Sequence, residues 1–134
     1  MTGSPDATIG HRVWAVPGGF MPAESTGAEP AMTSRDVLSV LNTGERAANV
    51  DVTIFYADRD PVGPYRFTVG ARRVRQVRVN DLIDPEAIPL ATPYAAVIAA
   101  DVPVVVQYLR QDTSQQANAL SSVMAFPATG AAPG

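Results

Sequence analysis

The chain has 134 residues, a net charge of −3 and no cysteine. Its length suits one domain, and the lack of cysteine excludes disulfides, thiolate nucleophiles and cysteine-ligated metals. The apolar runs are far too short to cross a membrane, and the first ten residues lack the pattern of a signal peptide. Because missing cysteines suit a reducing compartment, we expect a soluble, cytoplasmic protein.

Short β-prone runs separated by turn signals make up most of the chain. The predicted strands cover residues 12–16, 36–41, 48–56, 65–69, 72–79, 94–100, 103–110 and 119–126. Pro17-Gly18-Gly19 ends the first run, a proline-rich turn covers 58–64, and long loops cover 20–30 and 80–93. Residues 115–122 would also suit a helical turn. Alternation is clearest in 48–56, where Val50, Val52, Ile54 and Tyr56 share one face.

This succession of short strands predicts an all-β protein, an antiparallel β-sandwich or jelly roll. We expect one domain over residues 11–127, with flexible segments at 1–10 and 128–134. The sequence gives no pattern for a second domain or an internal repeat.

Catalytic patterns are weak in this sequence. The single histidine, His11, lies at the edge of the loose N-terminal segment, where little would hold it as a base. Zinc sites need several His or Cys ligands, and no phosphate-binding loop with its lysine is present. Asp58 and Asp60 in one loop, and Asp81 and Asp84 in another, leave a divalent ion as an alternative, without an EF-hand pattern. We predict no catalytic residue, cofactor or metal.

An arginine-rich strand is the most unusual local feature. All ten basic residues are arginine, and Arg72, Arg73, Arg75 and Arg78 lie within seven positions. One interpretation is an anion- or nucleic-acid-binding face, because guanidinium groups bind phosphate bidentately. The other is a solvated face whose arginines pair with acids on the sheet or across a subunit boundary. The overall acidity favours the second, so we do not expect nucleic acid as the partner.

A small-molecule site is a further hypothesis. Trp14 is either a core residue or a stacking platform for a sugar ring. The polar residues from Gln107 to Asn118 would line either a cleft for a polyhydroxylated ligand or an inter-subunit network. The candidate ligand-binding residues are Trp14, Arg59, Asp60, Tyr65, Asn80, Arg110 and Asp112.

Three stretches resemble the sensory rhodopsin transducer family. They are 51–66 (DVTIFYADRDPVGPYR), 69–82 (VGARRVRQVRVNDL) and 101–112 (DVPVVVQYLRQD). With the segment around Trp14, the similarity covers residues 12–127. The chain departs from the family pattern at Gln76 and Tyr108, where that pattern has histidine.

The resemblance implies a β-sandwich that assembles as a homotetramer and couples to a membrane photoreceptor or another receptor. We therefore expect an oligomeric adaptor that relays receptor state, with a polar partner surface and no enclosed pocket. A carbohydrate-binding module is the alternative, and it requires Trp14 or Tyr65 beside the polar candidates in a concave site. A DNA-binding regulator is a weaker one, and it requires the arginines of 72–78 on one continuous face.

Overall fold

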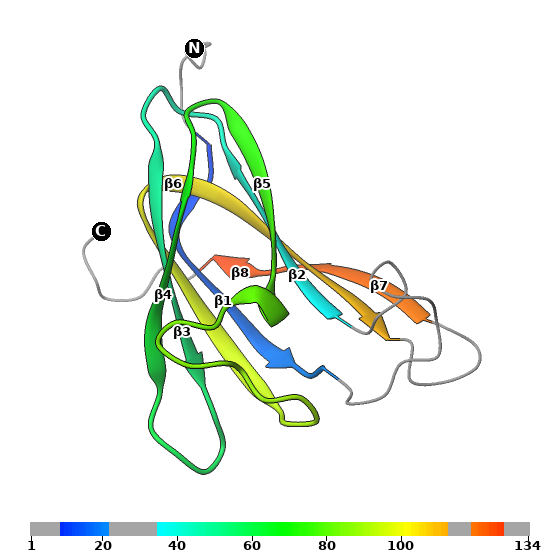
Figure 1. The fold of residues 1–134 in the computed structure, drawn as a ribbon. Helices are drawn as coiled ribbons and strands as arrows, with labels where there is room; N and C mark the ends of the chain where they lie inside the picture. The colour runs from blue at the N-terminus through cyan, green and yellow to red at the C-terminus, as the bar shows by residue number, and fades with distance from the viewer. Residues whose placement is uncertain (1–8, 22–34, 113–118, 128–134) are drawn as a thin grey trace.

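Figure 1 shows the computed structural model, which describes residues 9–21, 35–112 and 119–127. The described elements are β1 (His11–Gly19), β2 (Arg35–Asn42), β3 (Ala48–Phe55), β4 (Val62–Val69), β5 (Arg73–Arg78), the 3-10 helix η1 (Val79–Asp81), β6 (Tyr94–Asp112), β7 (Ala119–Met124) and β8 (Phe126–Pro127). All strand pairs are antiparallel. The predicted all-β fold is confirmed.

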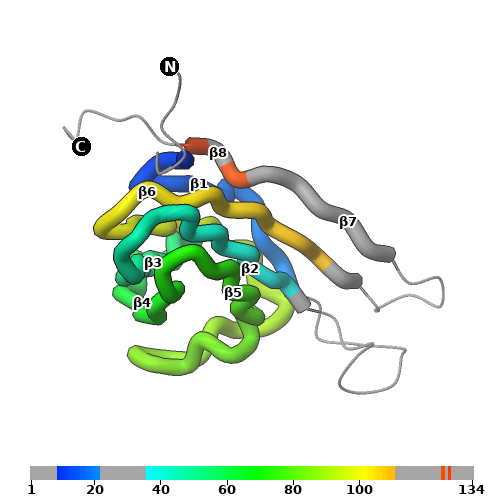
Figure 2. The backbone as a smooth tube through the Cα atoms, turned by 90° about the horizontal axis from the view of Figure 1, so that it is seen from above, coloured from blue at the N-terminus to red at the C-terminus, as the bar shows by residue number. Residues whose placement is uncertain are grey.

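The 19-residue strand β6 joins the two layers of the fold. Its first half pairs with β1 and β3 in a sheet of order β4-β3-β6-β1-β8. Its second half pairs with β2 and β7, and β2 carries β5 on its other side. Seen from above, the sheet curls over along β6 and places β5 and β2 across from β4 and β3 (Figure 2). We call the part of the sheet built on the first half of β6 the first layer, and the part built on its second half the second layer.

The prediction of two separate strands over 94–100 and 103–110 is wrong, because β6 runs through both. Proline weakens a strand by removing a ladder hydrogen bond. Here β1 pairs with β6 on both sides of Pro103, at Ala99 and Val104, with a register irregularity between them. On the other side of β6, the β3 pairings end at Ala100 and the β2 pairings begin at Val105, so Pro103 lies where a ladder hydrogen bond is not required.

Two other strands also extend through proline- and glycine-containing segments that were predicted to be turns. The strand β1 continues through Pro17-Gly18-Gly19, with a register irregularity between Val16 and Gly19. The strand β4 begins at Val62 and so contains Gly63 and Pro64, opposite a register irregularity in β3. Residues 119–122 are strand rather than helix, whereas 115–118 and most of the predicted loop over 20–30 fall outside the described residues.

The core lies between the two layers and follows the predicted alternation. Val50, Val52 and Ile54 are buried, while Phe55 is exposed on the opposite face of β3. Burying such side chains contributes about 1.5–3 kcal/mol each before conformational entropy is subtracted. From the second layer, Leu38, Val40, Val77, Val106 and Tyr108 complete the cluster.

Candidate functional site

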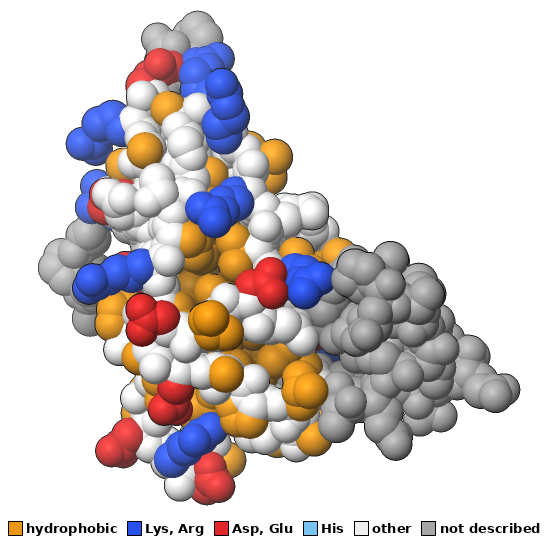
Figure 3. All heavy atoms as spheres, in the orientation of Figure 1, with side chains coloured by type: hydrophobic (Ala, Val, Ile, Leu, Met, Phe, Trp, Pro, Cys, Tyr) orange, Lys and Arg blue, Asp and Glu red, His pale blue; other side chains and the backbone are white. Residues whose placement is uncertain are grey.

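The two layers diverge on the side where β4 and β5 form their outer edges (Figure 1). Among the described strands, β4 pairs only with β3 and β5 only with β2. An open hollow of about 630 Å³ lies between them, which we call the arginine groove. It is lined by Arg66, Phe67, Arg75, Gln76, Val77, Arg78, Asp81 and Leu82. Figure 3 shows this face, with arginine side chains bordering an apolar strip.

The three arginines of the groove are only partly engaged by neighbours. Arg75 reaches across from β5, donating from Nη1 to the Thr68 carbonyl at 2.8 Å, and its guanidinium lies 5.5 Å from the centroid of the Phe67 ring. Arg78 contacts Asp81 at 3.3 Å, and Arg66 contacts Asp51 at 3.5 Å. A guanidinium has five N–H donors, so each group keeps donors for a further acceptor.

Positive charge is concentrated in the segment that builds the groove. Residues 61–80 contain five arginines and no acidic residue. The remainder of the chain has five arginines and thirteen acidic residues, a net charge of −8. In the groove itself, Arg66, Arg75 and Arg78 stand against Asp81, so the lining has a net charge of +2 (three minus one) on an acidic protein.

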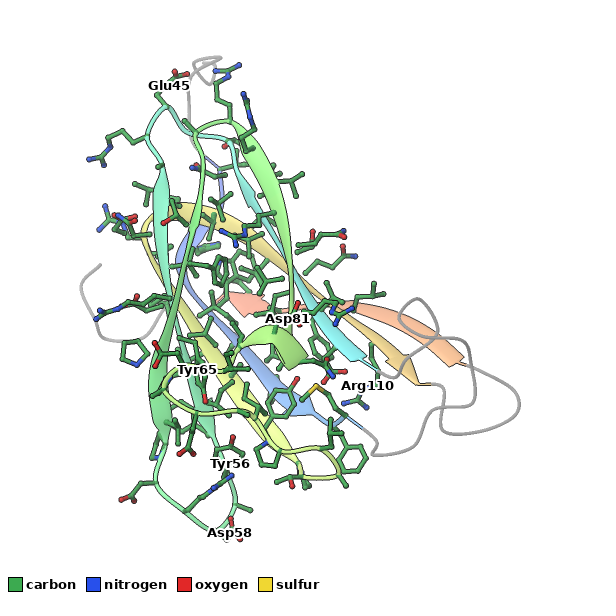
Figure 4. All side chains as sticks on the ribbon, viewed as in Figure 1. Glu45, Tyr56, Asp58, Tyr65, Asp81 and Arg110 are labelled. Atoms are coloured by element: carbon green, nitrogen blue, oxygen red, sulfur yellow. The ribbon has the colours of Figure 1, made fainter. Side chains whose placement is uncertain are left out.

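The arginines predicted as one face separate into two sets. Arg75 and Arg78 line the groove, whereas Arg72 lies in the turn between β4 and β5 and Arg73 begins β5. There Arg72 adopts φ 55° and donates to Glu45 at 2.7 Å, at the end of the molecule opposite the turn between β3 and β4 (Figure 4). Of the four arginines predicted as one face, the groove thus contains two.

Arg66 and Phe67 are groove residues that the candidate lists lack. Both precede the arginine strand by several residues, and only the placement of β4 beside β5 brings them to the same hollow. The one sequence signal was the alternation of Tyr65, Phe67 and Val69 on β4, which places Arg66 on the other face.

A second polar cluster forms where the β3–β4 turn meets the segment before β6. The Arg59 guanidinium lies 4.0 Å from the centroid of the Tyr56 ring and 3.9 Å from the Glu86 carboxylate. Tyr65 donates its hydroxyl to the Glu86 carbonyl at 2.6 Å, and burial raises the pKa of Tyr65 to about 12. Arg59 and Tyr65 are thus brought together, while Asp60 is exposed in the turn. Figure 4 shows Tyr56 close to the β3–β4 turn and Tyr65 further along the molecule.

A buried carboxylate organises a third cluster. Asp36 is fully buried and accepts hydrogen bonds from the Tyr94 hydroxyl at 2.5 Å, the Phe20 amide at 3.2 Å and Arg110 Nε at 3.4 Å. Arg110 also donates to the Tyr108 hydroxyl at 3.1 Å. Burial, reinforced by Asp36, raises the pKa values of Tyr94 and Tyr108.

Only Arg110 of this third cluster was among the predicted site residues. The sequence did contain a signal for Asp36. It alternates with Leu38 and Val40, so it lies on the same strand face as two apolar residues that are buried.

The remaining ligand candidates are Trp14, Asn80 and Asp112. Trp14 is 5% exposed, and its Nε1 donates to the carbonyls of Val104 at 2.9 Å and His11 at 3.0 Å, so its placement is that of the core interpretation. Asn80 lies in η1 with its Oδ1 buried and unpartnered among the described residues. The Asp112 side chain lies outside the described part.

Among the candidates whose side chains the structure describes, Arg59 and Tyr65 are brought together at Glu86, and Arg110 belongs to the separate cluster at Asp36. The rings of Trp14 and Tyr65 are too deeply buried to stack on a sugar. Within residues 9–21, 35–112 and 119–127, no group of three His, Cys, Asp or Glu side chains could hold a metal ion. In the same part of the chain, no helix has the length and apolarity that a membrane crossing requires.

Comparison with known proteins agrees with the fold. The sequence profile of the Anabaena sensory rhodopsin transducer family matches residues 9–127. A solved structure of the Anabaena sensory rhodopsin transducer is 47% identical, with a TM-score of 0.70, covering 76% of this chain and 98% of its own. The crystal structure of Thermotoga maritima 1070 is 26% identical, with a TM-score of 0.80, covering 90% and 97% respectively. A search of curated proteins gives no match.

The family match extends over all described elements and includes the strands that build the arginine groove. This similarity supports a signalling-related, transducer-like role. The chain belongs to the Anabaena sensory rhodopsin transducer family.

Proposed function

We propose that the protein is a cytoplasmic, oligomeric signalling adaptor that binds a receptor and relays its state without catalysing a reaction. The observation that carries this proposal is the arginine groove, an open surface between two strand edges. By contrast, the gap inside the core beside Leu38, Ile54 and Tyr94 has no volume that water could enter. Open strand edges suit the binding of another polypeptide, which can extend the sheet.

Self-association, as a homotetramer, is part of the same proposal. On the outer face of the second layer, Leu41 lies opposite Val74 on one side and Val105 on the other. Val74 is 61% exposed and Leu41 is 37% exposed. Neighbouring exposed apolar side chains favour a protein–protein contact, so we place the contact between subunits on this face.

The test is binding to a sensory rhodopsin reconstituted in nanodiscs, measured by biolayer interferometry in the dark and under illumination. We expect binding whose dissociation constant changes on illumination, because an adaptor must distinguish the two receptor states. Empty nanodiscs are the control. Equal binding to loaded and empty nanodiscs, or no dependence on light, would contradict the proposal.

A further inference from the structure

We propose that the arginine groove binds an extended acidic peptide segment of a partner protein, which pairs as an added strand with the outer edge of β5. This inference rests on the proposed function and names the chemistry of the partner at that site. Three features of the groove support it: a strand edge available for pairing, an excess of positive charge and an apolar floor.

The strand β5 offers the better of the two edges. It contains no proline, so the alternate residues of Arg73–Arg78 whose N–H groups point away from β2 all carry a donor for an added strand. The strand β4 contains Pro64, and its Thr68 carbonyl already accepts a hydrogen bond from Arg75. The part of β5 that lines the groove, Arg75 to Arg78, spans about 13 Å, which four residues of an added strand would match.

The charges of the groove select an acidic segment. Arg66 is 74% exposed at the side chain on the β4 border, and Arg78 is 41% exposed on the β5 border. Carboxylates at alternate positions of an added strand would project toward one border. A carboxylate matches the planar donor fork of arginine. Asp81 is the one acidic residue in the lining, and its ion pair with Arg78 offsets its repulsion of an acidic peptide.

The floor of the groove favours apolar side chains between those acids. Phe67, Val77 and Leu82 line the hollow from β4, β5 and the residue after η1. A segment that alternates acidic and apolar residues could therefore pack its apolar side chains on this floor and direct its acidic side chains to the arginines. A phosphate backbone has no apolar face to use this floor, and the chain's net charge of −3 opposes a long polyanion.

The experiment measures the fluorescence anisotropy of labelled Glu-Val-Glu-Val-Glu peptide with the full chain at about 0.1 M salt. The double variant Arg66→Gln/Arg78→Gln removes two groove charges, and Arg12→Gln/Arg46→Gln removes two exposed charges elsewhere. We expect each groove arginine to change the dissociation constant about tenfold. The control should stay within about twofold of the native chain. Arg66→Gln alone replaces the double variant if the latter does not fold.

Strand pairing has its own readout. With the peptide bound, we expect slower amide hydrogen exchange at Arg75 to Arg78 and weaker binding of a backbone N-methylated peptide. Three outcomes would overturn the inference: no peptide binding, an equal loss in the control variant, or tighter binding of duplex DNA that depends on the same arginines.

Different results would contradict the adaptor role and the assignment of the groove as a peptide site. Peptide binding without receptor binding refutes the adaptor role alone, because the groove would still recognise its acidic segment. Receptor binding that survives loss of the peptide interaction refutes the assignment of the groove alone.

Discussion

Replacing Asp36 with asparagine tests whether one buried carboxylate holds β1, β2 and β6 together. The change preserves the shape of the side chain but removes its charge and turns one acceptor into a donor. Asp36 accepts from Tyr94, Phe20 and Arg110, and an amide NH₂ facing the Phe20 amide or Arg110 would meet another donor, whereas the Tyr94 hydroxyl could accept from it. A hydrogen bond to a charged group contributes about 1.5–3 kcal/mol, and breaking a buried ion pair costs about 3–5 kcal/mol. Because the Arg110 side chain is 32% exposed, water offsets part of the loss.

We therefore expect Asp36→Asn to lower the free energy of unfolding by about 3 kcal/mol. For a domain of this size, that corresponds to a fall in Tm of about 10–15 °C. Urea and thermal unfolding followed by circular dichroism would measure both. The control is Asp60→Asn, in the exposed β3–β4 turn, where we expect a change within about 0.5 kcal/mol. A loss below about 1 kcal/mol for Asp36→Asn would refute the assumption that its hydrogen bonds persist in solution.

Three further predictions address packing, pH and assembly. In Gly19→Ala the new Cβ would lie 2.2 Å from the Tyr94 ring, so we expect a loss of about 1–3 kcal/mol, whereas Gly18→Ala meets open space and should melt like the native chain in scanning fluorimetry. Because the pKa of Tyr65 rises from 10.0 to about 12, its contribution to stability is complete below pH 10 and lost as pH rises toward 12. Urea titrations over that range should give a slope shallower by up to about 1.4 kcal/mol per pH unit in Tyr65→Phe, and an unchanged slope would contradict the shift. Val74→Glu puts a charge on the outer face of the second layer, so we expect self-association at least about tenfold weaker by light scattering, and an unchanged mass would remove that face from the interface.

Local patterns in the sequence were sufficient to predict the fold class but not the path of every strand. In β3 the alternation of residues along the sequence matches the alternation of buried and exposed side chains, so the pattern identified Val50, Val52 and Ile54 as buried. In β6 we expected Pro103 to end the strand, and that boundary was wrong. Proline interrupts a strand only where its missing N–H group would have bonded to a neighbouring strand. Whether Pro103 loses a pairing depends on which strands lie beside it, and these are distant in sequence.

The same limit explains why the β4 side of the arginine groove was missed. Arg75 and Arg78 were predicted as a binding or pairing surface because they stand together in the sequence. Arg66 and Phe67 belong to the groove only because β4 and β5 do not pair with each other. Strands joined by a turn as short as residues 70–72 would ordinarily form a hairpin, which would close the hollow.

Asn42 supplies a physical reason for the open arrangement. Its fully buried side chain donates from Nδ2 to the carbonyls of Arg46, Val69 and Gly70 at 2.8–3.3 Å, and its Oδ1 accepts from the Gly44 amide at 3.0 Å. These bonds tie the β2–β3 turn to the β4–β5 turn at one end of the molecule. From that fixed end β4 follows β3 in the first layer and β5 follows β2 in the second. The gap between them is thus a consequence of the two-layer architecture, and Arg66, Arg75 and Arg78 lie where it opens.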